Sequence, residues 1–239
     1  GADVLRYFLL RDMVIGLDAN LSEDALVRRN NSDLSNDLGN LARRAAGIVS
    51  KHFDGKVPAG PPPGPDEAPI IEKAAALRAA LPGLIADLKL HTAIEETLQL
   101  VRRLNKYVSE TVPFKTVKTD REAAARSLYT VLEGLRHVAW LLSPVMPAKM
   151  AELLRGLGAS APTTLDALVW GDLEPGTPLA LDRALFPRAE LPSAALTPPP
   201  TQPATASAPK TPAVAEADDA GMITFSEFEK IDLRVATVL

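Results

Sequence analysis

The chain lacks cysteine altogether, and only 5% of its 239 residues are aromatic. Without cysteine it forms no disulfide and offers no thiolate to a metal ion. Its three histidines are scattered along the sequence, so no metal site is predicted. No apolar run reaches the roughly 20 residues that a membrane span requires, and the N-terminus lacks the pattern of a signal peptide. These absences favour a reducing, cytoplasmic location and no membrane partner.

An excess of basic charge is also missing. Lys and Arg number 26 against 30 Asp and Glu, which gives a formal net charge of −4. The chain as a whole is therefore not a nonspecific binder of nucleic acid, and any contact with RNA must use a local face. What the sequence does hold is 46% hydrophobic residues. Ala and Leu dominate them, a composition that favours helices over strands.

Neither end of the sequence is typical of a natural terminus. The chain starts at Gly1 without a methionine and enters an apolar segment at once, and it stops inside the apolar, β-branched run 231–239. The sequence is therefore interpreted as an internal piece of a longer protein.

Helix-capping and helix-ending residues divide the first part of the chain into segments. Apolar periodicity predicts a short helix over 1–11. Ser22 is a good N-cap, with two acidic residues behind it, for a long helix that ends at Asp54-Gly55. The Pro-rich segment 56–65 is predicted to be an extended surface loop because proline has no backbone donor for a helix.

The middle of the chain carries the strongest helical patterns. Helices are predicted over 66–81, 84–110, 120–142 and 148–157. Pro82-Gly83 separates the first two of these, and Asp120 opens the third. Helices of this length, joined by short or Pro-marked loops, predict an all-α fold, a helical bundle over 22–190.

The last part of the chain differs in composition. Segment 163–187 is predicted to be irregular, with Trp170 and Phe186 as packing anchors. Segment 191–221 is rich in Pro, Ala and Thr and poor in large apolar residues, so it is predicted to be a disordered linker. Segment 222–239 approaches the alternation of a strand and is predicted to start a second, truncated domain.

One stretch, LSNDLGNLARR at 34–44, has two different faces. At helical spacing its apolar side continues through Leu34, Leu38, Leu41, Ala45, Ile48 and Val49. The opposite side is predicted to carry Arg29, Asp33, Asn36, Asn40, Arg43 and Arg44. Side-chain amides and guanidinium groups on an exposed face can hydrogen-bond to unpaired bases, whereas the simpler alternative is a solvated face. The stretch is a first indication of RNA binding.

At this point the sequence resembles a known family. GADVLRYFLLR, SEDALVRRNNSDLSNDLGNLARR, NKYVSETVPF, LLSPVMP and LFPR follow one another as in the C-terminal half of methionyl-tRNA synthetases. The resemblance makes 1–21 the end of the catalytic and stem-contact region and 22–190 the anticodon-binding bundle. MITFSEFEKIDLRVATVL, at 222–239, resembles the first strand of the OB-fold tRNA-binding domain that some members carry.

The resemblance implies an ATP-dependent ligase whose catalytic part lies upstream. The HIGH and KMSKS signatures of that part are absent here, so this fragment is expected to be inactive by itself, with no catalytic residue and no cofactor of its own. ATP would bind to the upstream domain, and whether zinc also binds there is left open. The implied partner is tRNA-Met, initiator and elongator, and the OB-fold domain allows a homodimer.

The resemblance also implies which residues contact the anticodon. In the family an Asn and an Arg four residues later face it, and they match Asn40 and Arg44. The family's Pro-Trp motif, whose tryptophan stacks on a base, is Pro113-Phe114 here. Phe114 keeps an aromatic face for stacking, and the alternative is that it packs between helices.

Three further residues are candidates for supporting roles. Asn36 and Arg43 lie on the same predicted face, where Arg43 could contact phosphates. Asn105 is expected to orient the Pro113-Phe114 loop. Tyr107, two residues further on, is expected to be a core residue with its hydroxyl hydrogen-bonded.

Two other functions remain as alternatives. The first is a helical protein-interaction or scaffold module whose polar face binds nothing specific. The second is the anticodon domain of a sibling class I synthetase, which the change from Pro-Trp to Pro-Phe allows.

Overall fold

The computed structural model describes residues 1–18, 21–160, 162–181 and 183–190. Within these ranges the chain is helical, as predicted. The elements are α1 (Ala2–Asp12), α2 (Glu23–Arg29), the π-helix η1 (Asn30–Gly39), α3 (Asn40–His52), α4 (Ala68–Ala86), α5 (Leu90–Thr111), α6 (Pro113–Thr116), α7 (Arg121–Leu142) and α8 (Pro147–Gly156). The predicted linker and strand over 191–239 lie outside the described residues.

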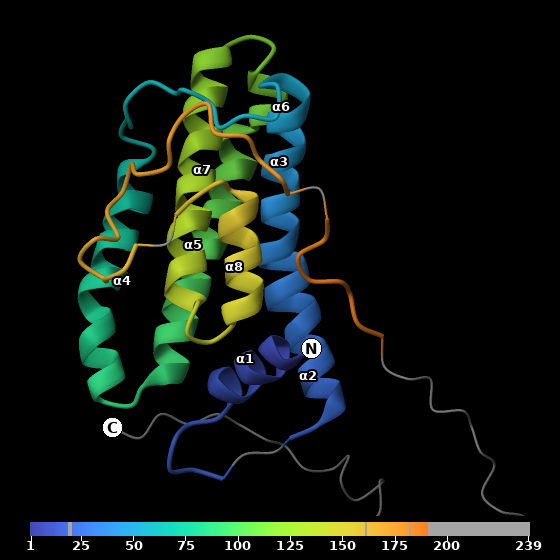
Figure 1. Cartoon of the computed structure of the whole chain (residues 1–239), viewed down its shortest axis with the longest axis vertical. Coiled ribbons are helices and arrows are strands. Elements are labelled where there is room, and N and C mark those ends of the chain that lie inside the picture. The colour runs from blue at the N-terminus through green and yellow to red at the C-terminus, as the bar shows by residue number, and fades with distance from the viewer. Residues whose placement is uncertain (19–20, 161, 182, 191–239) are drawn as a thin grey trace, which may run out of the picture. The chain divides into compact units, whose positions relative to one another are not determined.

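Helix α7 is the centre of the bundle. Most of its residues are buried, and α3, α5 and α8 pack around it, with α4 against α5 (Figure 1). Helices α5 and α7 pack closely at Gly134, where a Cβ would lie 2.7 Å from the methyl groups of Leu104. Helices α1 and α2 lie at one end of the bundle and α6 at the other (Figure 1). None of the described helices is long and apolar enough to cross a membrane.

The long helix predicted after Ser22 is present but is not uniform. The Ser22 hydroxyl accepts a hydrogen bond from the Ala25 N–H at 3.2 Å, as an N-cap should, and left-handed Asp54 and Gly55 follow the helix end. Between α2 and α3, however, the ten residues of η1 are π-helical. A π-helix has more residues per turn than an α-helix, so the faces rotate relative to the predicted stripe.

The predicted position of Asp33 on the polar face is wrong. The side chain was predicted on the exposed polar face, but the residue is only 4% exposed. Its carboxylate accepts a hydrogen bond from the Tyr7 hydroxyl of α1 at 2.7 Å. Asp33 therefore stabilises the packing of α1 against η1 and is not part of an RNA-binding face.

The predicted break at Pro82-Gly83 is also wrong. Helix α4 continues through Pro82 to Ala86, and α5 begins at Leu90 rather than Leu84. Proline removes one backbone donor, a small loss this close to the helix end. The actual break is at Leu88, whose φ of 57° is left-handed and closes α4.

Buried acidic side chains hold the irregular segments. The Glu67 carboxylate accepts from the Gly64 N–H at 2.6 Å and from the Tyr107 hydroxyl, which ties the Pro-rich loop to α5. The prediction of Tyr107 as a hydrogen-bonded core residue is thus confirmed. Glu133 of α7 anchors the C-terminal strap, defined as residues 162–181 and 183–190, by accepting from the Gly171 and Leu173 N–H groups.

Candidate nucleic-acid interface

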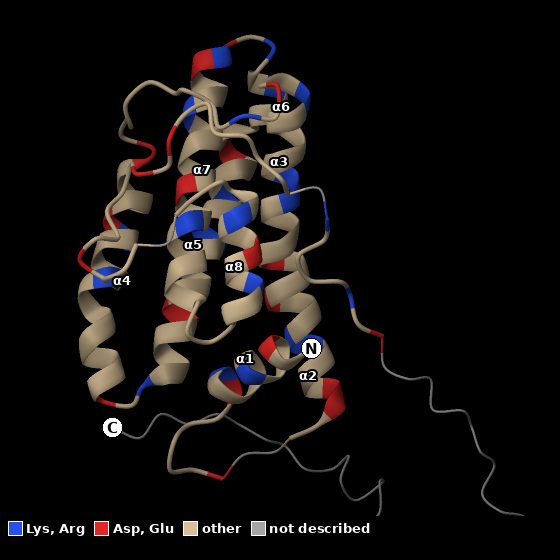
Figure 2. Cartoon of the chain, in the orientation of Figure 1, with Lys and Arg blue, Asp and Glu red and all other residues tan. Residues whose placement is uncertain are grey.

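A basic hollow opens between α3 and α6, at the end of the bundle away from α1. Its volume is about 560 Å³. The residues lining it are Arg43, Arg44, Gly47, Ile48, Lys51, His52, Phe114 and Lys118. No acidic side chain is among these lining residues, and Figure 2 shows Lys and Arg on α3 and around α6. This α3–α6 hollow is therefore a local basic face on a chain of net negative charge.

The amphipathic pattern of α3 places one wall of the hollow. Leu41, Ala45 and Val49 are buried against the bundle. Because residues three and four apart share a helix face, the opposite row carries Arg43, Arg44, Gly47 and Lys51 toward the hollow.

A sharp turn places the other wall. Val112 has a left-handed φ of 46°, which reverses the chain after α5, and Pro113 starts α6 with a buried ring. Phe114 is consequently 47% exposed, and the Lys115 ammonium lies 5.8 Å from its ring centroid. The alternative that Phe114 packs between helices is therefore wrong: an aromatic face is open to the hollow.

Asn40 and the two arginines are neighbours on α3. The Asn40 Oδ1 accepts a hydrogen bond from the Arg43 guanidinium at 3.2 Å. Arg44, half-buried, lines the hollow with Phe114, while Asn40 lies one helical turn before Arg44. The structure thus brings Arg43, Arg44 and Phe114 together, with Asn40 beside them.

The two remaining candidates lie apart from the hollow. Asn36 is exposed on η1. Asn105 does not orient the Pro113-Phe114 loop as expected: its Nδ2 donates to the Asp37 carbonyl at 3.0 Å and to the Val101 carbonyl at 3.2 Å. It lies eight residues before Pro113, about 12 Å along the helix axis, and cannot reach the loop. Its role is to tie α5 to η1.

Sequence reasoning missed several lining residues. Gly47 and Lys51 continue the helical row of Arg43 and Arg44, so extending the stripe by two turns would have found them. His52, eight residues after Arg44, lies on the same row, whereas Lys118 gave no comparable signal. Lys118 reaches the hollow only because the turn at Val112 folds α6 toward α3.

Comparison with known proteins gives first a class and then a family. Residues 1–46 match the family described as tRNA synthetases class I (M), so the chain has the features of a class I aminoacyl-tRNA synthetase. Residues 57–190 match the family described as the anticodon binding domain of methionyl tRNA ligase. The chain belongs to the methionyl-tRNA ligase family. The alternatives of a sibling synthetase and of an unrelated scaffold module are not supported.

Individual relatives agree. The chain is 35% identical to the methionine–tRNA ligase of Deinococcus radiodurans, over 99% of this chain and 38% of the relative. It is 37% identical to that of Mycobacterium tuberculosis, over 80% of this chain and 38% of the relative. The chain thus spans less than two fifths of the length of these relatives.

Solved structures show the same fold. The apo form of the Mycobacterium tuberculosis methionyl-tRNA synthetase is similar with a TM-score of 0.75 and 34% identity, covering 80% of this chain and 39% of that one. The structure of that enzyme in complex with methionyl-adenylate is similar with a TM-score of 0.73.

Proposed function

We propose that this chain is the tRNA-selecting part of a methionine–tRNA ligase and binds the CAU anticodon at the α3–α6 hollow. The observation that carries the proposal is the half-exposed ring of Phe114 beside Arg44 in a hollow lined by basic side chains. Family membership supports tRNA as the partner, since an anticodon-binding domain of a synthetase binds tRNA.

Each side chain has a chemistry suited to an unpaired base. The Asn40 amide offers an acceptor and two donors to a base edge, and the Arg44 guanidinium donates or stacks through its plane. The Phe114 ring stacks on one base, a contact worth roughly 1–3 kcal/mol. An incorrect base would leave buried polar groups without partners, and that loss provides discrimination.

The experiment measures binding of a CAU anticodon stem-loop and of one whose first anticodon base is changed to U. We expect the changed stem-loop to bind about tenfold or more weakly, because one base edge loses its hydrogen bonds. Equal affinity for both stem-loops would overturn the proposal.

Variants of the hollow assign the contacts. Asn40→Ala, Arg44→Ala and Phe114→Ala should each weaken binding of the CAU stem-loop with unchanged helicity, while Phe114→Trp should retain it. Lys73→Ala on α4 is the control, since it removes one positive charge, paired with Glu96 in a half-buried position, that does not line the hollow. A loss of affinity in this control as large as in Arg44→Ala would mean that charge alone is responsible.

The activity of the full-length protein is part of the same proposal. ATP-dependent charging of methionine would take place on the upstream domain, and this fragment alone would be inactive. Among the described residues no three His, Cys, Asp or Glu side chains form a group that could hold a metal ion. Initiator and elongator tRNA-Met as partners, a homodimer through the segment after residue 221, and a cytoplasmic location complete the proposal.

A further inference from the structure

Gly47 occupies a position where the fold does not require glycine. It lies in the middle of α3, exposed and in helical conformation. A Cβ built on it would meet no heavy atom within 4 Å. Glycine inside a helix is less favourable than alanine because it restricts the unfolded backbone less. The missing side chain is therefore unfavourable for stability and has no packing reason.

The position of Gly47 indicates a reason. It lines the α3–α6 hollow and also a second hollow, of about 510 Å³, on the other side of its helix row. The second hollow is lined by Arg43, Ala46, Gly47, Ser50, Gly55, Leu179, Ala180 and Leu181. Only Arg43 and Gly47 line both. The two hollows therefore meet at Gly47, and a side chain there would form a ridge between them.

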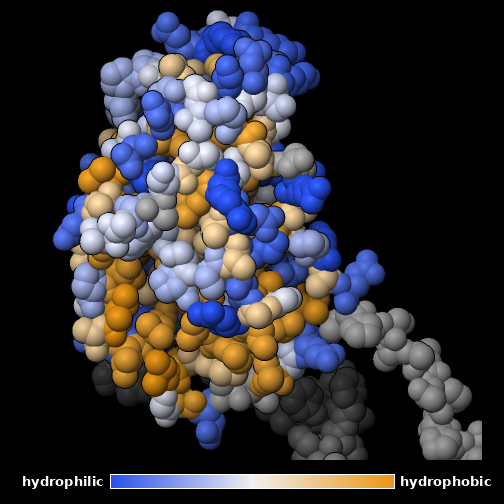
Figure 3. All heavy atoms as spheres, viewed as in Figure 1, coloured by the Kyte–Doolittle hydropathy of each residue, from blue (hydrophilic) through white to orange (hydrophobic). Residues whose placement is uncertain are grey.

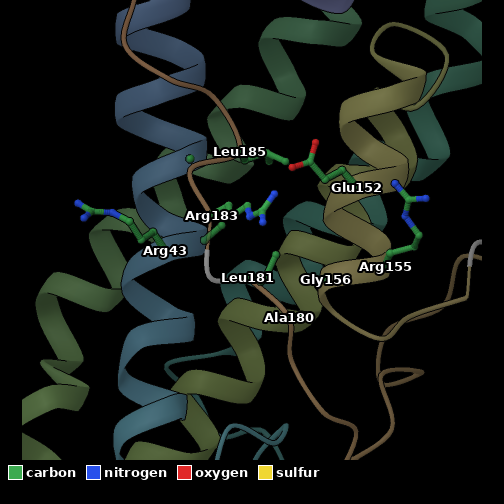
Figure 4. A pocket seen from close by; sticks show the side chains of 10 residues that line it. Arg43, Glu152, Arg155, Gly156, Ala180, Leu181, Arg183 and Leu185 are labelled. Atoms are coloured by element: carbon green, nitrogen blue, oxygen red, sulfur yellow. The ribbon is translucent and has the colours of Figure 1, made fainter.

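The second hollow shares part of its lining with a third, which Figure 4 shows. Arg43, Ala180 and Leu181 line both the second and the third hollow. Gly39 at the end of η1 and Ala42 of α3 also line the third. In Figure 4 the Arg183 side chain points into the space between α3 and α8, while Arg43 projects from α3 away from it. The third hollow is lined by Arg43, Arg155 and Arg183 together with Glu152, whereas Arg43 is the one charged residue that lines the second.

We propose that the bound RNA crosses α3 at Gly47, so that a nucleotide flanking the anticodon packs on the helix backbone and against Leu179 and Leu181. Both leucines are half-buried and offer an apolar surface to a base or ribose face. Arg43, which lines both hollows, is placed to contact the intervening phosphate. This inference rests on the proposed anticodon function and adds a second nucleotide subsite to it.

The test places a side chain at position 47 and leaves the other residues that line the hollow unchanged. Gly47→Leu is compared with Gly83→Leu on α4, which is also an exposed helical glycine with no heavy atom within 4 Å of a built Cβ. Leucine is a good helix former, so both variants should unfold at a higher temperature than the wild type. Gly47→Leu should bind the CAU stem-loop about tenfold more weakly, the loss of one packed nucleotide, and Gly83→Leu should bind it unchanged.

Abasic substitution identifies the nucleotide. Each flanking position of the stem-loop is made abasic in turn, and the effect of Gly47→Leu should disappear for one of them. An affinity of Gly47→Leu within twofold of the wild type would overturn the crossing. A different measurement tests the anticodon proposal: equal binding of the CAU and changed stem-loops by the wild-type chain would contradict it.

Discussion

At the scale of single residues, several polar and charged side chains are buried and hydrogen-bonded to specific partners. Glu133 is fully buried, and its Oε1 accepts from the Arg136 Nη2 at 2.7 Å and from the Gly171 N–H at 2.9 Å. The His137 Nδ1 lies 3.1 Å from the carbonyl of Glu133, and burial lowers the pKa of His137. These groups connect the centre of α7 to the C-terminal strap.

Removing the charge of Glu133 should therefore destabilise the fold strongly. In Glu133→Gln the buried Arg136 guanidinium loses its buried counter-charge and keeps only the exposed Asp172 at 3.5 Å, and we expect a loss of about 3–5 kcal/mol in the free energy of unfolding. Urea denaturation followed by circular dichroism measures it.

The matched control is Glu110→Gln on α5. Glu110 is exposed and pairs with Arg103 at 3.2 Å, so its loss should cost less than about 1 kcal/mol. Equal destabilisation by the two substitutions would contradict the anchoring role of Glu133.

At the scale of the element, η1 is held in its π-helical form by partners from three segments. The Asn31 amide exchanges two hydrogen bonds with the backbone of Ala189, at 2.8 and 2.9 Å. The Asp37 carbonyl accepts from Asn105, and Asp33 accepts from Tyr7. A π-helix is rare because its backbone geometry is poorer than that of an α-helix, so these contacts explain its persistence.

Tyr7→Phe should loosen this element selectively. Burial, together with the Asp33 charge, raises the pKa of the Tyr7 hydroxyl, which keeps it a donor to Asp33. Without that donor a buried carboxylate loses a hydrogen bond, which costs roughly 1–3 kcal/mol. Amide hydrogen exchange over 30–39 should accelerate more than exchange in α7.

Tyr107→Phe provides the comparison, because it removes a buried hydroxyl that contacts Glu67 and not η1. Its effect on exchange should centre on the Pro-rich loop and leave 30–39 no faster than the rest of the bundle. Similar acceleration of 30–39 in both variants would mean that η1 only reports global stability.

At the scale of the whole bundle, the two ends differ in character. The end with α6 is hydrophilic, whereas apolar surface gathers toward the opposite end (Figure 3). The large apolar side chains exposed on α1, the loop after it and the α4–α5 turn are Leu5, Val14, Ile15, Leu17, Leu21, Ile85 and Leu88. The basic α3–α6 hollow lies at the hydrophilic end of a chain whose net charge is −4.

The small number of basic side chains in the hollow predicts a moderate salt dependence of RNA binding. Four cationic side chains line the α3–α6 hollow, so the slope of log affinity against log salt should be about −2 to −4. Replacing Lys51 and Lys118 with Ala should make the slope shallower by about 1 to 2, and Lys73→Ala should not change it. A slope unchanged in the double variant would place the phosphate contacts outside the hollow.

Much of the local structure follows from the sequence by itself. The helix starts at Ser22 and Asp120 are correct, and the Asp120 carboxylate accepts from the Ala123 N–H at 2.9 Å. Asn40 and Arg44 also lie off the buried stripe of α3, as the pattern predicts, although both are half-buried rather than exposed. Caps and helical periodicity act between residues a few positions apart, so neighbouring letters of the sequence are enough to specify them.

Other features depend on distant partners. Pro82 stays inside α4, Asp33 turns inward to Tyr7, and Asn105 contacts Asp37 rather than the loop before Phe114. The sequence determined the helices, their caps and the face that carries Asn40 and Arg44. Only the tertiary structure decided which polar groups are buried and which basic side chains share a hollow with Phe114. Burial and hydrogen-bond satisfaction depend on segments that meet only when the chain folds.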